Sequence, residues 1–335
     1  MSLTRGGAKL IKVQNLSKTY QTKTKKGFFS SAKAEIQAVK DLSLEIPKGK
    51  ITGLLGLNGA GKTTTIKMLT TILEPTSGKI YYDGEDINQN IKAIRGKINM
   101  IAGGERNLYW RLTAKENLEY FGALYHIPKD QLKKRIDELL AIVGLSASKD
   151  IPVERFSKGM KQRLQIAKGL INDPEYIFLD EPTLGLDIQI AKELRLYIKD
   201  IAQKFNKGVL LTTHYLGEVE ELCDYMYIIG DGSLVAEGTT EHIISQIDKK
   251  NIYVITIRDD KKGGLATFEI EHPSVIMMND GEQKDLRIEI DNNVAPLQEV
   301  IESLVKLNML IIDVQQKKMN LEEALLKLQK RLEVG

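Results

Sequence analysis

Short apolar runs alternate with longer helix-like stretches through most of the chain. The apolar runs have the length of buried strands and occupy 51–55, 175–179, 208–213 and 226–229. The stretches between them place apolar residues three and four positions apart, as amphipathic helices do. We expect these helices within 64–73, 113–144, 157–170 and 189–205. Strands that alternate with helices in this way are typical of an α/β fold built on a parallel sheet.

The N-terminal part of the chain predicts two more strands, at 9–13 and 38–46. The segment 21–35 between them is rich in lysine and small polar residues, so we expect an inserted surface loop there. A solvated loop is the simpler interpretation of its charge, and contact with anionic lipid is the alternative. Asp-Gly pairs at Asp83 and Asp231 mark two turns, and the second joins two strand-like runs as a hairpin.

The pattern changes near Asp248. Strand-like runs at 252–257, 266–270 and 286–290 are separated by charged or glycine-rich turns, and amphipathic helices are expected at 294–307 and 321–332. This arrangement predicts a small α+β unit. We therefore expect two domains, 1–245 and 246–335.

Composition limits the classes of protein that the chain can belong to. Its 335 residues include 48 Lys and Arg against 45 Asp and Glu, with 42% hydrophobic and 28% charged residues. These values disfavour a disordered chain and a strongly basic protein that wraps nucleic acid. The single cysteine excludes an intrachain disulfide, and no apolar run approaches the roughly 20 residues that span a bilayer. We expect a soluble protein of a reducing compartment.

A glycine-rich segment joins the strand at 51–55 to the helix that follows. Its sequence, Gly-Leu-Asn-Gly-Ala-Gly-Lys-Thr, fits G-x-x-x-x-G-K-[ST] in the strand–loop–helix context that this motif requires. Glycines allow backbone N–H groups to close around a phosphate, and the helix N-terminus adds partial positive charge. Lys62 would reach the terminal phosphates and the Thr63 hydroxyl would bind Mg²⁺. The expected nucleotide-binding residues are Gly56, Leu57, Asn58, Gly59, Ala60, Gly61, Lys62, Thr63 and Thr64.

The strand at 175–179 leads into two acids, Asp180 and Glu181. The carboxyl ends of parallel strands meet at one edge of a sheet, so these side chains can reach a phosphate bound at the same edge. Asp180 is suited to hold Mg²⁺, directly or through water. Glu181 is suited to orient or deprotonate the attacking water. The two motifs together predict a nucleotide hydrolase.

The segment Phe156-Ser-Lys-Gly159 narrows the choice of hydrolase. Alone, it would be explained by Ser157 capping the helix that follows. In this order along the chain, it resembles the signature motif of the ATPase subunit of an ATP-binding cassette (ABC) transporter, with Lys158 in place of the more usual second glycine. A P-loop kinase or GTPase would not explain this segment. The resemblance implies an α/β P-loop NTPase cassette with a mixed sheet core, an antiparallel β subdomain and a helical subdomain at about 106–170, followed by a small C-terminal α+β domain.

The resemblance also implies roles for single residues. In the family, the signature serine hydroxyl and glycine amide, here Ser157 and Gly159, bind the γ-phosphate held by the opposite subunit. Asp187 matches the D-loop, which crosses the dimer interface, and His214 matches the switch histidine, which contacts the γ-phosphate. Tyr20 resembles the aromatic residue that stacks on adenine, although an ordinary strand-edge tyrosine is the alternative. The expected catalytic residues are Glu181 and His214, and the expected metal ligands are Thr63 and Asp180.

One family element is missing. The family usually places a glutamine after the strand that follows the first hairpin, where it senses Mg²⁺ and the permease. Here Gly104 aligns best with that glutamine, and Glu105 is the only oxygen ligand nearby. Either the carboxylate substitutes for the glutamine or water completes the metal shell.

The resemblance implies an ATP-binding subunit that hydrolyses ATP at a head-to-tail dimer interface and powers export through a separate membrane permease. The expected cofactors are ATP and Mg²⁺. The expected partners are a second copy of the chain and a permease, at the cytoplasmic face of the membrane. The alternative is a soluble ABC-type ATPase acting on nucleic acid or ribosomes. It is disfavoured because only 95 residues separate Lys62 from Ser157, without inserted cysteines, and the chain has one cassette; we expect no nucleic-acid partner.

Three further features have two interpretations each. Tyr109, Trp110 and Arg111 are residue types enriched at interfaces and would dock the permease, or else the aromatic pair packs in the core. The C-terminal pattern at 319–328 resembles the ABC-2-type group of drug, antibiotic and sodium exporters, and the C-terminal unit would assist dimerisation or regulation, or sense a ligand. Cys223, expected on a helix at 216–224, is interpreted as a small buried hydrophobe rather than a reactive thiol.

Overall fold

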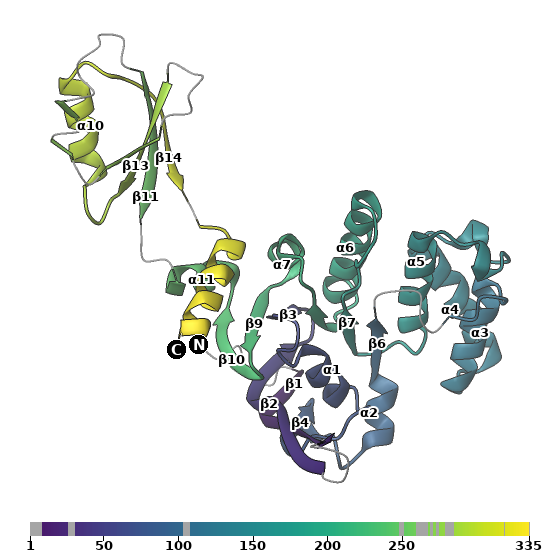
Figure 1. Cartoon of the computed structure of the whole chain (residues 1–335). Coiled ribbons are helices and arrows are strands. Elements are labelled where there is room, and N and C mark those ends of the chain that lie inside the picture. Colours follow the sequence, from purple (N-terminus) through teal and green to yellow (C-terminus); the bar gives the residue numbers. More distant parts are fainter. Residues whose placement is uncertain are drawn as a thin grey trace. The chain divides into compact units, whose positions relative to one another are not determined.

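The computed structural model describes residues 9–25, 31–102, 108–247, 251–258, 267–268, 271–272, 275–278, 285–317 and 319–334. The chain divides into two compact units, Met1–Thr240 and Glu241–Gly335. The described residues form two sheets in the first unit and one in the second, and Figure 1 labels most of their strands and helices. No helix within the described residues is long and apolar enough to cross a bilayer.

An antiparallel sheet forms one layer of the first unit. Its spatial order is β2 (Ser31–Pro47), β1 (Leu10–Lys25), β4 (Ser77–Tyr82) and β5 (Glu85–Asp86). β1 and β2 pair from Leu10 opposite Pro47 to Lys25 opposite Ser31. The expectation of a loop at 21–35 is therefore wrong for the residues that are described. The polar segment extends the hairpin, because backbone pairing between strands does not require apolar side chains.

The second sheet has six strands and lies at the centre of the unit. In spatial order they are β10 (Ser233–Gly238), β9 (Tyr225–Gly230), β3 (Ile51–Gly56), β8 (Gly208–Thr212), β7 (Tyr176–Asp180) and β6 (Ile98–Ala102). All pairs are parallel except the β9–β10 hairpin. The expected parallel sheet is confirmed, and the carboxyl ends of β3, β8 and β7 are neighbours at one edge.

Helices cover this sheet and supply its two hydrophobic cores. They are α1 (Lys62–Leu69), α2 (Ile91–Lys97), α6 (Ile188–Gln203) and α7 (Leu216–Leu222). One core lies between the two sheets and includes Ile46, Leu54 and Phe178. The other extends from the opposite face of the central sheet to the helices. Cys223 directly follows α7 instead of lying within it, and its sulfur packs so closely on Gly53 that a Cβ there would be 3.0 Å away.

A helical subdomain projects from the central sheet (Figure 1). It contains α3 (Ala114–Leu124), α4 (Lys129–Ile142) and α5 (Lys158–Gly169). α3 begins with a capping box, in which the Thr113 hydroxyl accepts from the Glu116 amide at 3.1 Å and the Glu116 carboxylate accepts from the Thr113 amide at 2.7 Å. Apolar residues at helical spacing on α4, including Leu132, Ile136 and Leu139, form the subdomain core.

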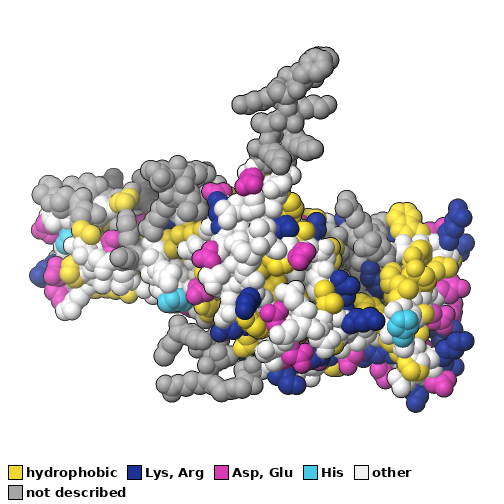
Figure 2. Space-filling model, turned by 90° about the horizontal axis from the view of Figure 1, so that it is seen from below, with side chains coloured by type: hydrophobic (Ala, Val, Ile, Leu, Met, Phe, Trp, Pro, Cys, Tyr) yellow, Lys and Arg dark blue, Asp and Glu magenta, His cyan; other side chains and the backbone are white. Residues whose placement is uncertain are grey.

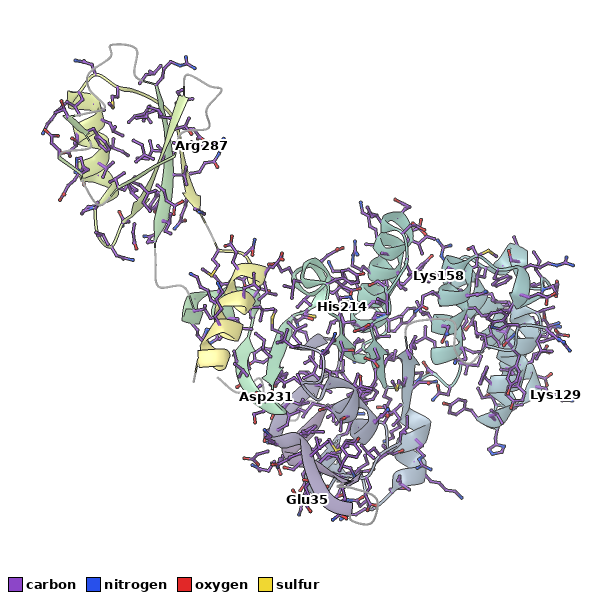
Figure 3. The ribbon with its side chains drawn as sticks, viewed as in Figure 1. Glu35, Lys129, Lys158, His214, Asp231 and Arg287 are labelled. Atoms are coloured by element: carbon purple, nitrogen blue, oxygen red, sulfur yellow. The ribbon has the colours of Figure 1, made fainter. Side chains whose placement is uncertain are left out.

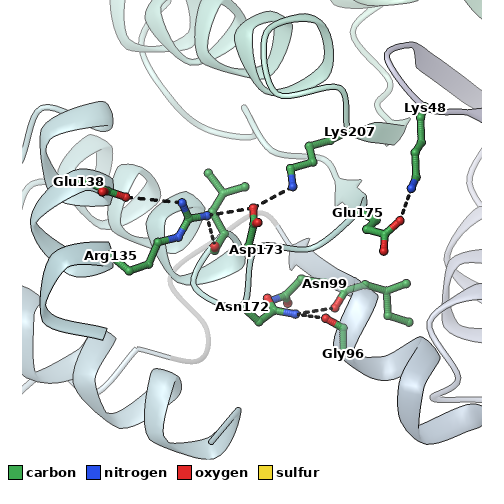
Figure 4. Close-up of polar contacts among 11 residues, drawn as sticks. Lys48, Gly96, Asn99, Arg135, Glu138, Asn172, Asp173, Glu175 and Lys207 are labelled. Carbon is green, nitrogen blue, oxygen red and sulfur yellow. Dashed lines mark hydrogen bonds and ion pairs between the residues drawn. The ribbon is translucent and has the colours of Figure 1, made fainter. Parts of the chain in front are cut away.

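Polar contacts connect this subdomain to the sheet (Figure 4). Arg135 on α4 donates to the carbonyl of Leu170 at 2.9 Å and pairs with Asp173 at 3.3 Å. Asp173 also pairs with Lys207, which precedes β8, at 2.8 Å. Asn172 donates to the carbonyl of Gly96 at 3.0 Å. The loop that joins α5 to β7 is therefore fixed on both sides, and this limits how α5 can move relative to β7.

Between its two flanking helices, the second unit has the β-α-β-β-α-β order of a split βαβ fold, in which the described residues 267–268 and 271 represent the first helix. It contains α8 (Thr240–Ile247), β11 (Ile252–Arg258), β12 (Ile276–Met278), β13 (Asp285–Asp291), α10 (Leu297–Lys306), β14 (Leu310–Lys317) and α11 (Leu321–Val334), with sheet order β12-β13-β11-β14. The strand expected at 266–270 is wrong where the segment is described, because Thr267 and Phe268 are helical. Phe268 is fully buried in the core between this sheet and α10. β12 and β14 were not expected from the sequence.

Candidate active site

The loop between β3 and α1 can be formed only with glycine at certain positions. Gly59 and Gly61 have φ angles of +86° and +102°, in the left-handed region that other residues rarely adopt. Gly61 directly precedes α1, and a Cβ at this position would lie 2.4 Å from the carbonyl oxygen of Ala38 on β2. The loop is therefore held tightly against the antiparallel sheet, with the N-terminus of α1 directed at the space it surrounds.

That space is a cavity of about 180 Å³ at the carboxyl edge of the central sheet. Its lining combines the glycine-rich loop with the acidic end of β7, and consists of Ala38, Asn58, Gly59, Gly61, Lys62, Thr63, Thr64, Asp180 and Glu181. The structure thus brings together most of the loop residues expected to bind nucleotide and both acids. Gly56 and Leu57 contribute through their carbonyls, and Ala60 is buried behind the loop.

Lys62 is the cationic centre of the cavity. Its side chain is 8% exposed, and its ammonium group donates to the carbonyls of Gly56 at 2.6 Å and Leu57 at 3.1 Å. Burial lowers the pKa of Lys62, and the negative charges of Glu181 and Asp180 oppose that shift. A phosphate oxygen would replace the carbonyls as acceptor and would also compensate the buried charge.

Asp180 is fixed by the neighbouring strand. The Thr212 hydroxyl, at the end of β8, donates to its carboxylate at 2.5 Å. Thr212 is itself buried, so this hydrogen bond is protected from water. The carboxylate therefore stays at the edge of the sheet, beside Thr63 in the cavity lining.

Glu181 has an unusual backbone conformation for its residue type. Its φ is +52°, and its amide donates to the carbonyl of Thr212 at 2.9 Å. A non-glycine residue in this region costs on the order of 1–3 kcal/mol and is common at active sites. The carboxylate lies 3.1 Å from Nδ1 of His214, whose ring packs on Tyr215 with centroids 4.4 Å apart. The two expected catalytic residues therefore form a pair.

Ser157 and Asp187 occupy helix N-termini. The Ser157 hydroxyl accepts from the Met160 amide at 3.2 Å at the start of α5, and Asp187 accepts from the Ile190 amide at 3.0 Å at the start of α6. Neither lines the cavity of its own chain, and neither does Gly159. Their expected contact with a nucleotide stays a prediction that requires a second copy.

The two N-termini are packed against each other. A Cβ on Gly159 would lie 2.4 Å from Cδ1 of Ile190, and one on Gly185 would lie 2.2 Å from the ammonium of Lys158. Figure 3 labels Lys158, at the start of α5, and His214, which lies between β8 and α7. The segment 157–159, which resembles the signature motif, and the segment 184–187, which resembles the D-loop, thus pack against each other within one chain.

Two other expected residues, Tyr20 and His214, are not among the residues that line the cavity. Tyr20 lies on β1 opposite Ile36, with the Lys18 ammonium 5.7 Å from its ring centre, and its role with adenine stays a prediction. Gly104 and Glu105 lie outside the described residues. Ala38 and Thr212 contribute to the site but were not identified from the sequence. A hint was present for Thr212, which lies two residues before His214.

An aromatic surface lies at the start of the helical subdomain. Tyr109 and Trp110 are about half exposed, at 47% and 50%, so the interpretation of this pair as core packing is wrong. The buried amide of Asn117 holds the segment in place, accepting from the Tyr109 amide at 2.8 Å and donating to its carbonyl at 3.0 Å. Trp110 also packs under the ammonium of Lys161 at 4.4 Å. Figure 2 shows exposed hydrophobic side chains toward the subdomain end of the first unit.

Comparison with known proteins gives consistent matches. The family model described as ABC transporter matches residues 39–184. The chain is 41% identical over 215 residues to the ABC transporter ATP-binding protein NatA of Bacillus subtilis (strain 168), covering 64% of this chain and 87% of NatA. It is 33% identical over 325 residues to the linearmycin resistance ATP-binding protein LnrL of the same organism, covering 95% of this chain and 98% of LnrL. A dimeric ATP-binding cassette in a post-hydrolysis state, bound to ADP and Pi, covers 68% of this chain and 98% of its own, with 26% identity and a TM-score of 0.60.

Proposed function

The chain belongs to the ATP-binding subunits of ABC transporters, and we propose that it hydrolyses ATP between two of its own copies to drive export through a separate membrane permease. The convergence of Lys62, Asp180 and Glu181 on one cavity is the observation that supports this function. The expected fold, a P-loop cassette, is confirmed. The alternative function on nucleic acid or ribosomes has no support from the compared proteins, whose names describe transport, resistance or an ATP-binding cassette.

Phosphate binding would use the backbone and one charge. Positive φ angles orient the loop amides inward, and α1 adds the partial charge of its N-terminus. Lys62 would exchange its carbonyl acceptors for terminal phosphate oxygens. Because the ammonium is already desolvated, its interaction with phosphate carries little further desolvation cost and is stronger than in water.

The donor set beside Lys62 fits a magnesium ion. The Thr63 hydroxyl and the Asp180 carboxylate are hard oxygen ligands, and both line the cavity. Bound Mg²⁺ would neutralise charge on the phosphates. The contribution of the chain is to hold Asp180 still, through the hydrogen bond from Thr212.

The Glu181–His214 pair would act on the attacking water. The Glu181 carboxylate can accept a proton from that water, and its αL backbone sets the direction of the side chain. An ionised Glu181 carboxylate can only accept, so Nδ1 of His214 would donate in their 3.1 Å contact. His214 would thereby restrain the carboxylate, and a hydrogen bond from Nε2 to a γ-phosphate oxygen would require that this nitrogen also carries a hydrogen.

A second copy would complete each site. Ser157 and Gly159 are at the N-terminus of α5, a position suited to a phosphate, yet they lie outside the cavity of their own chain. We propose that they and Asp187 meet the nucleotide of the opposite copy, as the family resemblance implies, and that Tyr20 stacks on adenine. The half-exposed pair Tyr109 and Trp110 would dock the permease, which places the protein peripherally at the cytoplasmic face of the membrane.

Replacement of Glu181 by Gln tests this function. The variant should retain ATP-dependent dimerisation but lose hydrolysis by about 10²–10⁴-fold, because the amide is no base. Glu175→Gln, just before β7 at the opposite end of the strand, is the matched control and should keep its activity. Full hydrolysis by the Glu181 variant would refute the catalytic assignment.

Mixed crosslinking tests the head-to-tail arrangement. Copies that carry Asn58→Cys should crosslink to copies that carry Ser157→Cys only when ATP is present. Burial raises the pKa of the native Cys223, so this thiol is a poor competitor for the crosslinker. Equal crosslinking without ATP, or none at all, would contradict the proposed dimer.

A further inference from the structure

Glu218, on α7, is the only acid among the fully buried polar side chains in the described part of the chain. It is 3% exposed, and burial raises the pKa of its carboxyl. Such a group is expensive to bury unless it makes specific contacts. Its position away from the nucleotide cavity shows that phosphate binding is not the reason for it.

The contacts of Glu218 lead to the two catalytic segments. The Thr183 hydroxyl donates to Oε2 of Glu218 at 3.2 Å. The Thr213 side chain also interacts with this carboxyl and, like Thr183, opposes the rise of its pKa. Thr183 lies two residues after Glu181, and Thr213 directly precedes His214. One carboxyl therefore joins the segments that carry the two catalytic side chains.

This contact is placed where the sheet no longer holds these segments together. β7 and β8 pair up to Asp180 opposite Thr212, and one further backbone hydrogen bond runs from the Glu181 amide to Thr212. Beyond this point the segment after β7 continues to α6, and the segment after β8 continues to α7. Glu218 bridges them one step farther on, behind the Glu181–His214 contact.

We propose that Glu218 is a positioning residue that sets the distance between Glu181 and His214 without touching the nucleotide. The inference rests on the proposed ATPase function and adds a residue to its machinery. A mutation that displaces catalytic groups by 1 Å can lower the rate by about 10²-fold, so the loss of a carboxyl that positions them can have a large effect. Removing it leaves the Thr183 hydroxyl without its acceptor and loosens the connection between α7 and the segment after β7.

The second oxygen of Glu218 indicates which substitution will be tolerated. Oε1 has no hydrogen-bond partner among the described residues, and the carboxyl lines a cavity of about 430 Å³ with Arg195 and Glu221. Arg195, on α6, favours the ionised form of Glu218, while Glu221 disfavours it, and Arg195 pairs with Glu221 at 2.6 Å. A glutamine keeps an oxygen that can accept the Thr183 hydrogen and would place its amide nitrogen at the position of Oε1, which accepts no hydrogen bond from the described residues. The contact with Thr183 requires a hydrogen-bond acceptor at the end of the residue 218 side chain and does not require a charge.

Steady-state kinetics of two Glu218 variants tests the proposal in the full-length chain. Glu218→Ala should lower kcat at least about 10-fold with KM for ATP within twofold of wild type, and Glu218→Gln should keep more than half of the wild-type kcat. Glu221→Ala, on the same helix and lining the same cavity, is the matched control and should change kcat less than about twofold. A Glu218→Ala enzyme with normal kcat would overturn the proposal, and so would a Glu218→Gln enzyme as slow as the alanine variant.

A second variant keeps the proposal testable if Glu218→Ala does not fold. Thr183→Val with Thr213→Val keeps side-chain shape and removes both donors, so it should also lower kcat without raising KM for ATP. Unchanged kcat in a folded double variant would overturn the proposal. The proposed function is judged separately by ATP hydrolysis of the wild type and by Glu181→Gln, neither of which depends on Glu218.

Discussion

A methyl group added at Gly159 should destabilise the contact between the signature segment and the D-loop segment. In Gly159→Ala, the new Cβ would meet Cδ1 of Ile190 at 2.4 Å, while Cγ2 and Cγ1 of the same side chain, at 3.1 and 3.3 Å, would require only a small shift of Ile190. Overpacking of this kind costs about 1–3 kcal/mol, and replacing glycine in a helix returns about 0.5–1 kcal/mol. We expect a net loss of about 1–2 kcal/mol in the free energy of unfolding.

The matched rescue removes a single carbon. Ile190→Val deletes Cδ1, the one atom in severe conflict, and should cost about 0.5 kcal/mol alone because Ile190 is only partly buried. The double variant should therefore be more stable than Gly159→Ala. Urea unfolding of the four proteins gives the coupling free energy, which we expect to be about 1 kcal/mol in favour of the double variant.

ATP hydrolysis by the same four proteins separates two reasons for glycine at this position. Alanine keeps the backbone amide that would bind phosphate, so hydrolysis should return in the double variant if the constraint is Ile190. Stability restored without hydrolysis would show that the nucleotide of the opposite copy excludes the methyl group. Normal stability of Gly159→Ala, or strict additivity of the two changes, would refute the packing argument.

Three other predictions follow from the same contacts. His214→Ala should lower kcat about 10²-fold, yet add little in the Glu181→Gln background, because the two side chains act as a unit; phosphate release measures both. Tyr82→Phe should cost about 1–2 kcal/mol in urea unfolding, because the buried hydroxyl donates to the Leu69 carbonyl at 2.6 Å. Burial lowers the pKa of Lys168 to about 8, against 10.5 for the free group. The unfolded chain thus holds this proton more tightly between these pH values, so the free energy of unfolding should rise over that range by about 2 kcal/mol, a rise that Lys168→Met should abolish.

The central sheet and the phosphate loop were predictable because their signals are local. Buried parallel strands are continuous apolar runs, and the loop needs glycine wherever φ is positive, as at Gly59 and Gly61. The position of the acids at 180–181 was also predictable, because parallel strands end at one edge of the sheet and both acids line the cavity there. Each of these features depends on residues close together in the sequence.

The errors lie where a short pattern has two physical solutions. The five residues 266–270 alternate like a strand, but Phe268 reaches the core of the second unit from a helical turn. β14 was missed because an edge strand with most side chains exposed has no alternation to read. At 21–35, lysine and small residues indicated a surface position but said nothing about backbone pairing, which extends the β1–β2 hairpin.

Residues that act through distant neighbours were beyond the reach of sequence reasoning. The spacing of Thr183, Thr213 and Glu218 in the sequence does not show that the Glu218 carboxyl interacts with both threonine side chains. These interactions exist only in the folded chain. The unusual φ of Glu181 is similar, since the hydrogen bond to Thr212 stabilises it from another strand. Such features follow from tertiary packing.

These packing contacts join the two functional surfaces of a single chain. Gly159 packs on the Ile190 side chain without room for a Cβ, and the Ile190 amide donates to Asp187 at the start of α6. The segment 184–187 begins directly after Thr183. The Thr183 hydroxyl donates to Glu218 on α7, the helix that follows His214. If Ser157 contacts the nucleotide of a second copy, as we propose, a displacement of Ser157 would pass through this packing to the segment that follows Glu181. Close packing, rather than a flexible linker, would then connect the interface to the geometry of hydrolysis within each chain.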